Sequence, residues 1–144
     1  MRLEQQTVLD ARPSDVWAYV TDPANVPRFL EGVTRWDAQG QQRLGPGARL
    51  SVRMQVGTAH LGGLIEIIEW QDGREMAWTS ITGVDQRGRW RLRPVDHDRT
   101  RFLLRLTYNV PGGLLGRLTE LVAARMVNRN ISRSLAKLKA QVER

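Results

Sequence analysis

The residue types that most often carry out catalysis are scarce in this chain of 144 residues. It contains no cysteine and two histidines, His60 and His97, which are too far apart in the sequence to suggest a metal-ligand cluster. His97 lies in the polar segment Asp96-His97-Asp98, typical of a solvated turn, and His60 lies near the end of an expected hairpin. We therefore predict no metal, no cofactor and no catalytic set of residues.

Three further groups could take part in proton transfer if they point into a pocket. Glu66 and Glu69 flank an irregular strand pattern, so one of them can face inward and act as a base, although outward solvation is the favoured interpretation. Tyr108 is the best candidate for an inward hydroxyl group, with Asn128 and Asn130 as polar partners. The alternative is that Tyr108 packs its ring at the rim of the sheet.

The elements that must position these residues follow from the spacing of apolar residues. Arg87–Arg93 alternates arginine with Gly88, Trp90 and Leu92, the period-two pattern of a half-buried strand. The same pattern, with glycine-rich turns between runs, predicts strands at 2–9, 33–39, 48–56, 60–71, 75–82, 86–94 and 100–110. The alternation breaks at Ile67-Ile68, which predicts a bulge.

Helices are predicted in two places. Pro13 and Pro23 each suit the first turn of a short helix, and Asp22 can cap the second one. After Pro111-Gly112-Gly113 about thirty residues are compatible with one long helix. We predict a single α+β domain over residues 1–144, with a seven-stranded antiparallel sheet curved around the C-terminal helix and two short helices between strands one and two. Neither a signal peptide nor a membrane span is evident, so a cytoplasmic location is expected.

Seven segments of the chain carry a resemblance to a known group of proteins; they are Asp10–Pro13, Val16-Trp17, Thr21–Pro23, Trp78–Gly83, Gly88–Trp90, Thr107–Gly116 and Leu135–Lys139. With the order of the predicted elements, they resemble the helix-grip fold of the START-like (SRPBCC) superfamily, which includes plant allergens of the Bet v 1 type. Within it, the chain is most similar to the bacterial polyketide cyclase/dehydrase and lipid-transport group, and also resembles coenzyme-Q-binding START proteins. The resemblance spans the whole chain and implies a fold, but it carries over no catalytic residue.

A curved sheet closed by a helix can enclose a cavity for an apolar molecule such as a lipid, a quinone or a polyketide-like compound. The inward sheet positions and the first half of the helix supply the predicted ligand-binding residues, which are Met54, Trp78, Trp90, Leu106, Tyr108, Leu118, Leu121, Val122 and Arg125. For Trp78 and Trp90 a purely structural role in the core is the alternative. An enzymatic alternative is a cyclase or dehydratase in which Tyr108 or a glutamate moves protons.

Positive charge is concentrated in the second part of the sequence. Residues 1–84 have a net charge of −2, from 8 arginines and 10 acids, and residues 85–144 have +9, from 14 basic residues and 5 acids. Arg125, Arg129, Arg133 and Lys137 recur every four residues and predict a basic ridge on the helix. This surface can contact an anionic membrane or the ribosome; the alternative is a solvated face in a chain rich in arginine. Specific DNA binding is not expected, and a homodimer is left open.

The long helix does not keep one apolar side at about 100° per residue. Leu114, Leu118, Leu121 and Val122 form one cluster, and a second cluster comprises Val127, Ile131, Leu135, Leu138 and Val142. The change predicts a bend or break near Met126–Asn130. It also predicts that the first half, hinged at Gly112-Gly113 and Gly116, covers the pocket mouth as a movable gate.

Overall fold

Two long, adjacent strands are the clearest example of how the sequence forms the sheet. They are β6 (Asp85–Asp96) and β7 (Arg99–Asn109). The structure is a computed structural model, and it describes residues 2–40, 44–56, 58–109 and 120–143. In β6 the residues from Gln86 to Leu92 alternate between buried and more exposed positions, as the period-two pattern predicts. Trp90 pairs with Leu104 of β7 in antiparallel register, and both side chains are fully buried on the concave face.

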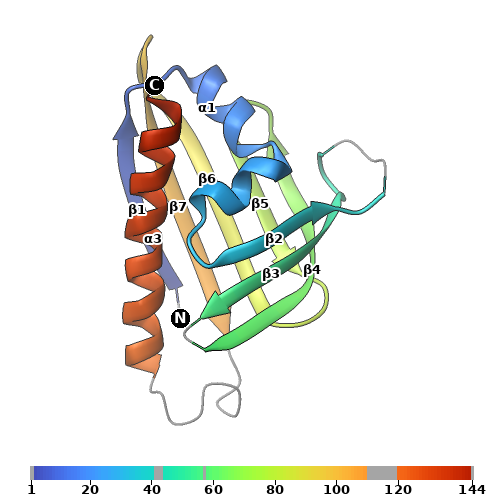
Figure 1. Cartoon of the computed structure of the whole chain (residues 1–144). Coiled ribbons are helices and arrows are strands. Elements are labelled where there is room, and N and C mark those ends of the chain that lie inside the picture. The colour runs from blue at the N-terminus through green and yellow to red at the C-terminus, as the bar shows by residue number, and fades with distance from the viewer. Residues whose placement is uncertain (1, 41–43, 57, 110–119, 144) are drawn as a thin grey trace.

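The described part of the chain contains one seven-stranded antiparallel sheet, in the order β1-β7-β6-β5-β4-β3-β2 (Figure 1). The remaining strands are β1 (Arg2–Leu9), β2 (Val33–Ala38), β3 (Arg49–Val56), β4 (Ala59–Gln71) and β5 (Glu75–Ser80). The predicted α+β class and helix-grip arrangement are confirmed.

The predicted bulge is also confirmed, because the register between β4 and β5 shifts between Ile67 and Glu69. Ile68, the extra residue, is 48% exposed, while Ile67 stays buried. The bulge thus changes which β4 side chains face the core beyond this point.

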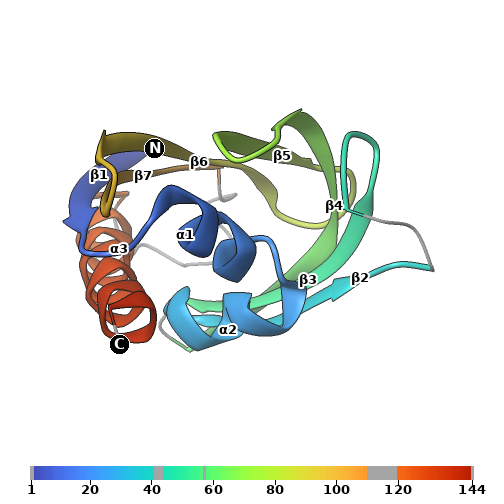
Figure 2. The ribbon, with the colours of Figure 1, turned by 90° about the horizontal axis from the view of Figure 1, so that it is seen from above.

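Three short helices follow β1 and cover one end of the curved sheet (Figure 2). They are α1 (Pro13–Val20), the 3-10 helix η1 (Pro23–Asn25) and α2 (Val26–Phe29). Pro13 and Pro23 lie in the first turns of α1 and η1, and the Asp22 carboxylate accepts a hydrogen bond from the Ala24 N–H at 3.0 Å. The sequence predicted two short helices here, and the second of them is divided into η1 and α2.

The C-terminal helix α3 (Glu120–Val142) runs as one continuous element along β1 and across the open side of the sheet (Figures 1 and 2). Its apolar column of Val127, Ile131, Leu135 and Leu138 is buried against the core. The predicted bend or break near Met126–Asn130 is wrong. The low helix propensity of asparagine costs only a few tenths of a kcal/mol, roughly, and packing of the buried column outweighs it.

The other apolar cluster gives α3 no second buried face within the described residues. Val122 is 38% exposed, Leu114 and Leu118 lie outside the described residues, and nothing is described of the Leu121 side chain. The predicted hinge at Gly112-Gly113 and Gly116 lies outside them as well. In the part of the chain that the structure describes, no helix has the length and apolar character needed to cross a membrane.

Candidate functional site

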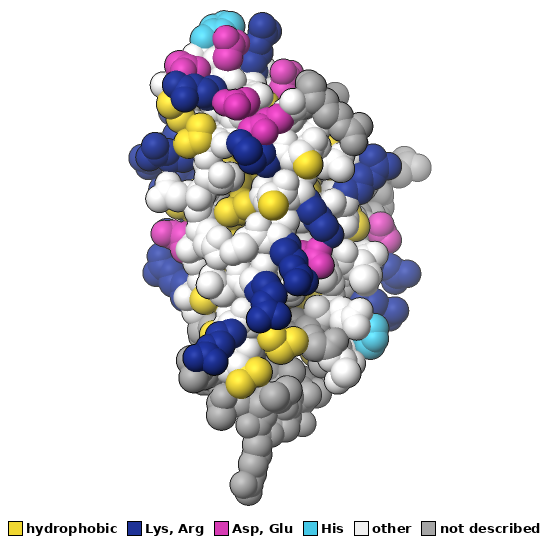
Figure 3. All heavy atoms as spheres, turned by 60° about the vertical axis from the view of Figure 1, so that its left-hand side comes forward, with side chains coloured by type: hydrophobic (Ala, Val, Ile, Leu, Met, Phe, Trp, Pro, Cys, Tyr) yellow, Lys and Arg dark blue, Asp and Glu magenta, His cyan; other side chains and the backbone are white. Residues whose placement is uncertain are grey.

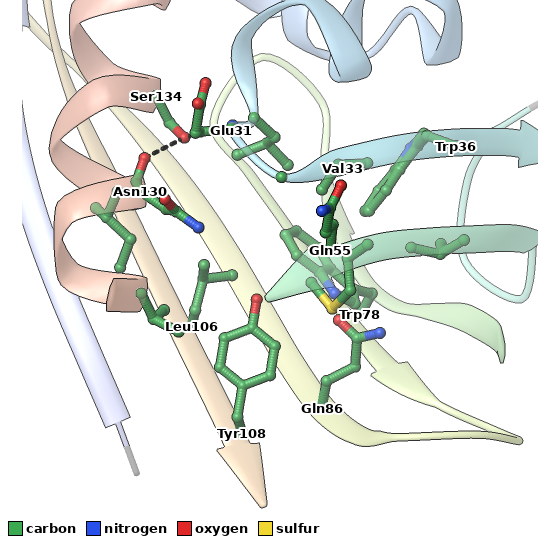
Figure 4. A pocket seen from close by; sticks show the side chains of 16 residues that line it. Glu31, Val33, Trp36, Gln55, Trp78, Gln86, Leu106, Tyr108, Asn130 and Ser134 are labelled. Atoms are coloured by element: carbon green, nitrogen blue, oxygen red, sulfur yellow. Dashed lines mark hydrogen bonds between the residues drawn. The ribbon is translucent and has the colours of Figure 1, made fainter. Parts of the chain in front are cut away.

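A cavity lies between the concave face of the sheet and α3, and its volume is about 30 Å³ (Figure 4). The sheet contributes apolar side chains to its lining, among them Trp36, Val52, Met54, Trp78 and Leu106. The opposite side is formed by Val127, Asn130, Ile131 and Ser134 of α3, together with the segment Leu30–Gly32 that follows α2. The cavity therefore has a sheet wall, which contains the large aromatic rings, and a helix wall.

The sheet wall rests on a cluster of three tryptophans. The ring centroids of Trp36 and Trp78 are 5.2 Å apart with an interplanar angle of 85°, and those of Trp78 and Trp90 are 5.2 Å apart at 65°. Both pairs are edge-to-face contacts, the geometry that aromatic quadrupoles favour. Phe29 and Phe102 approach Trp90 from two further directions, at 6.1 Å and 6.4 Å. The wall is thus supported by a second layer of aromatic rings.

Gly88 makes room for the Trp78 ring. The two residues are direct cross-strand partners on β6 and β5. A Cβ atom added at Gly88 would lie 1.9 Å from Cζ2 and 2.2 Å from Cε2 of Trp78, far inside van der Waals contact. The indole therefore lies directly over the Gly88 backbone, and any side chain at position 88 would displace it.

Two indole nitrogens of this cluster are buried without an acceptor in the described part of the chain. Within the described residues, Nε1 of Trp78 and Nε1 of Trp90 make no hydrogen bond, and the two residues are 2% and 0% exposed. By contrast, Trp17 Nε1 on α1 donates to the Asp72 carboxylate at 3.1 Å. A buried N–H without an acceptor costs about 1–3 kcal/mol, and Trp78 is also one of the residues that line the cavity.

The helix wall has two polar residues, Asn130 and Ser134, beside the apolar Val127 and Ile131, and it is held to the segment after α2. Ser134 Oγ accepts a hydrogen bond from the Glu31 N–H at 2.8 Å and donates to the Asn130 carbonyl oxygen at 2.6 Å (Figure 4). One turn further along α3, Lys137 forms an ion pair with the Glu31 carboxylate. These contacts form a seam between α3 and the segment after α2, next to the cavity.

A second set of hydrogen bonds holds the other side of α3 to β1. Gln5 Nε2 donates to Asn128 Oδ1 at 2.7 Å, and Ser132 Oγ donates to Gln5 Oε1 at 3.0 Å. Asn128 therefore bonds to the outer strand, whereas Asn130 lines the cavity. The helix is fixed along both sides, with the cavity between the two rows of contacts.

Tyr108 and Gln86 add polar groups to the sheet side of the cavity, and each is 6% exposed. Burial raises the pKa of the Tyr108 hydroxyl well above its ordinary value of 10.0. The hydroxyl therefore keeps its proton at neutral pH, where it can donate a hydrogen bond but cannot act as a base. The inward position predicted for Tyr108 is confirmed.

The structure brings together four of the nine residues predicted to bind a ligand. Met54, Trp78, Leu106 and Tyr108 line the cavity. Trp90 is buried behind Trp78 and is not among the described lining residues, and neither are the exposed Val122 and Arg125 on α3. Leu118 lies outside the described residues, as does the side chain of Leu121. A ligand-binding role for these residues stays a prediction.

Several lining residues were missed by the sequence-based prediction. Gln86 has the same strand parity as Gly88 and Trp90, so the alternation could have identified it. Asn130 and Ser134 are four residues apart and flank the apolar column of α3, which a helical projection could have shown. Glu31 and Gly32 come from a connection whose place beside α3 depends on tertiary packing, and no local signal points to them.

The other candidate catalytic groups lie away from the cavity. Glu66 and Glu69 face outward and pair with Arg49 and Arg89. His97 is exposed in its turn beside Asp98, and His60 is also exposed. No group of three or more potential metal ligands occurs among the residues that the structure describes.

Comparison with known proteins identifies a family that matches nearly the whole chain. A family model described as "Polyketide cyclase / dehydrase and lipid transport" matches residues 1–143. No curated protein sequence matches the chain.

Solved structures share the fold at low sequence identity. The protein TTHA0849 from Thermus thermophilus is 21% identical, with 99% of this chain and 97% of that chain covered and a TM-score of 0.82. The Zhui aromatase/cyclase from Streptomyces sp. R1128 is 19% identical, with coverage of 100% and 94% and a TM-score of 0.78. A START superfamily protein from Mycobacterium smegmatis is 13% identical, with coverage of 99% and 97% and a TM-score of 0.72.

Proposed function

Because the chain belongs to the polyketide cyclase/dehydrase and lipid-transport family of the START-like superfamily, we propose that it binds an apolar small molecule between the sheet and α3. The ligand would be a neutral lipid, quinone or polyketide-like compound that carries a carbonyl or another acceptor oxygen. The observation that carries this proposal is the unpaired indole N–H of Trp78, buried beside an apolar cavity.

The chemistry of the lining favours such a ligand. Trp36, Trp78, Met54 and Leu106 offer apolar area, and burying that area against a ligand contributes about 25 cal/mol per Å². An acceptor oxygen placed at Trp78 Nε1 would also remove the cost of the unpaired donor. The one carboxylate among the described lining residues, Glu31, is already paired with Lys137, so an anionic or cationic ligand gains little there.

The cavity must enlarge to hold a ligand of this kind. Its volume of about 30 Å³ fits about one water molecule, whereas sites for drug-sized ligands usually measure about 300–1,000 Å³. Met54 is unbranched and can change rotamer at low cost, while the edge-to-face tryptophans cannot move without losing their mutual contacts. We infer that enlargement occurs by movement of Met54 and of the helix wall.

Two measurements on purified protein test this proposal. One sample is extracted with organic solvent to recover a bound compound, and another is measured by native mass spectrometry to detect the complex. We expect a bound apolar compound, or a complex after incubation with a short-chain quinone or a fatty-acid methyl ester. Val127→Phe fills the cavity and should abolish the complex, whereas Val95→Phe adds the same bulk at an exposed position of β6 and should not. Recovery of no compound, together with no complex for either probe, would overturn the proposal.

The buried hydroxyl of Tyr108 favours a cyclase or dehydratase as the second candidate function. With its pKa raised, this group stays protonated and can donate a hydrogen bond to a carbonyl oxygen of a poly-β-ketone chain. Incubation with a synthetic polyketone should then give a cyclised, dehydrated product that Tyr108→Phe no longer forms. Equal product from both proteins would exclude Tyr108 as the hydrogen-bond donor.

A further inference from the structure

One face of α3 carries a row of exposed basic residues. Arg125, Arg129, Arg133 and Lys137 follow one another at four-residue spacing, and all four are exposed. At about 1.5 Å of rise per residue this row extends for about 18 Å along the helix. Figure 3 shows dark blue side chains following one another along this side of the molecule. We call these four residues the α3 basic row.

Most of the positive charge in the α3 basic row is not neutralised by the protein. Within the described residues, the side chains of Arg125, Arg129 and Arg133 make no ion pair or hydrogen bond, and the Lys137 side chain pairs with Glu31. On the sheet, many of the outward arginines have a carboxylate partner, with Glu66, Glu69, Glu75 and Glu4 serving Arg49, Arg89, Arg91 and Arg105. The row is therefore available to an anionic partner.

Apolar surface accompanies the charge. Val122 is 38% exposed, and at about 100° per residue it projects from the helix between the directions of Arg129 and Arg133. Met126 lies on the same side and is half-buried. A helix face that combines arginine with exposed aliphatic side chains suits the boundary between lipid headgroups and acyl chains.

One end of the α3 basic row reaches the seam beside the cavity. Lys137 of the row pairs with the Glu31 carboxylate, and the Glu31 N–H is bonded to Ser134, which lines the cavity. A surface bound to the row would therefore lie near the seam at its Lys137 end.

From this arrangement we propose that the α3 basic row, together with Val122, docks the protein on an anionic lipid surface. A nucleic acid fits less well, because α3 has no aromatic residue for base stacking and presents the exposed aliphatic side chain of Val122 beside the row. Each basic residue near an anionic bilayer strengthens binding by about fivefold. Docking itself does not require a ligand in the cavity. Docking could also allow an apolar molecule to pass directly between the bilayer and the cavity, and only that step rests on the proposed function.

Vesicle co-sedimentation of the full chain tests the proposal. The probes are phosphatidylcholine vesicles with and without phosphatidylserine, at low and at physiological salt. We expect binding only to the vesicles that contain phosphatidylserine, with affinity that falls as salt rises. The double variant Arg129→Gln and Arg133→Gln should bind about twenty-fivefold more weakly, as expected for the loss of two basic residues.

The matched control is the double variant Arg93→Gln and Arg101→Gln. It removes the same charge from exposed arginines that face each other across β6 and β7 on the convex face, and it should bind as the native protein does. Circular dichroism verifies that both variants are folded.

Three results would overturn the proposal. The first is failure of the native protein to sediment with phosphatidylserine vesicles at low salt, and the second is equal weakening by both double variants. The third is tighter binding to a single-stranded RNA homopolymer, lost in the α3 variant, because it would make the row a nucleic-acid surface. The cavity-filled variant Val127→Phe should sediment as the native protein does, which separates failure of docking from failure of ligand binding.

Discussion

The sheet wall and the helix wall of the cavity differ in how they are held together. On the sheet side, Trp36, Trp78 and Trp90 interlock by ring contacts, and the nitrogens of Trp78 and Trp90 remain without an acceptor in the described chain. On the helix side, Asn130 and Ser134 are polar, and Ser134 is hydrogen-bonded to the segment after α2. Interlocking aromatic rings form one wall, whereas the other combines apolar residues of α3 with a few exchangeable hydrogen bonds.

This difference indicates which wall selects a ligand and which wall admits it. Interlocked aromatic rings lose contacts when any one of them moves, so the sheet wall has a fixed shape and a fixed donor. A hydrogen bond at the seam contributes only about 0.5–1.5 kcal/mol net, because water can replace either partner. We therefore expect specificity to reside on the sheet wall and access to occur beside α3.

The largest predicted effect comes from removing the centre of the aromatic cluster. Trp90→Ala should lower the free energy of unfolding by about 3–5 kcal/mol, because Trp90 is fully buried and contacts four other rings. Urea denaturation measures this loss, and Val127→Ala on the helix wall should cost clearly less. Equal losses from the two variants would contradict the distinction between the walls.

A smaller loss is predicted when one methyl group is added beneath Trp78. Gly88→Ala places a Cβ atom within 1.9 Å of the indole, so the ring or the strand must shift, at about 1–3 kcal/mol. Gly45→Ala is the control, because no atom lies within 4 Å of its added Cβ. Thermal unfolding of both variants should show a lower Tm for Gly88→Ala alone. An unchanged Tm would mean that the wall is not rigid.

The seam should be weaker than either of these packing contacts. Ser134→Ala leaves the Glu31 N–H without its acceptor and should lower stability by about 1 kcal/mol. It should also speed the association of a quinone measured by stopped-flow tryptophan quenching, because the helix wall opens more readily. Ser132→Ala, which removes an exposed hydrogen bond to Gln5 on the other side of α3, should leave this rate unchanged. Faster association in both variants would place access elsewhere.

The last predicted effect concerns the free energy of unfolding at alkaline pH. Ionisation of Tyr108 should not change this free energy at neutral pH. The pKa of Tyr108 is raised in the folded protein, so its contribution to stability is fully present below the ordinary value of 10.0. As the pH rises above that value, the unfolded chain releases this proton while the folded chain retains it, and stability falls. Urea midpoints measured across this range should decline more steeply in the native protein than in Tyr108→Phe. Parallel declines would show that the hydroxyl is not shielded from water.

The fold was predictable because local patterns and global packing agree. The alternation in β6 and β7, the turn glycines and the helix-starting prolines each specify an element independently of its neighbours. The predicted bend in α3 failed for the opposite reason. It assumed that both apolar clusters are buried, whereas Val122 stays exposed and one buried column is enough to hold the helix in place.

The cavity was only partly predictable. Strand parity identifies Met54, Trp78, Leu106 and Tyr108, and it could have identified Gln86. Parity alone does not separate a lining residue from one a layer deeper, because Trp78 and Trp90 share the inner face and differ only in how the rings stack. The position of Glu31 depends on a hydrogen bond to a residue 103 positions away, and no local pattern encodes it.

The most direct test of the account is the response of the indole N–H groups to a ligand. In a ¹⁵N–¹H spectrum the Trp78 signal is assigned by its loss in Trp78→Phe, and the Trp17 signal, whose N–H is already bonded to Asp72, provides an internal reference. On titration with a quinone the account predicts a downfield shift of the Trp78 signal that saturates, while the Trp17 signal stays in place. An unmoved Trp78 signal in the presence of every quinone and fatty-acid methyl ester tested would contradict the account.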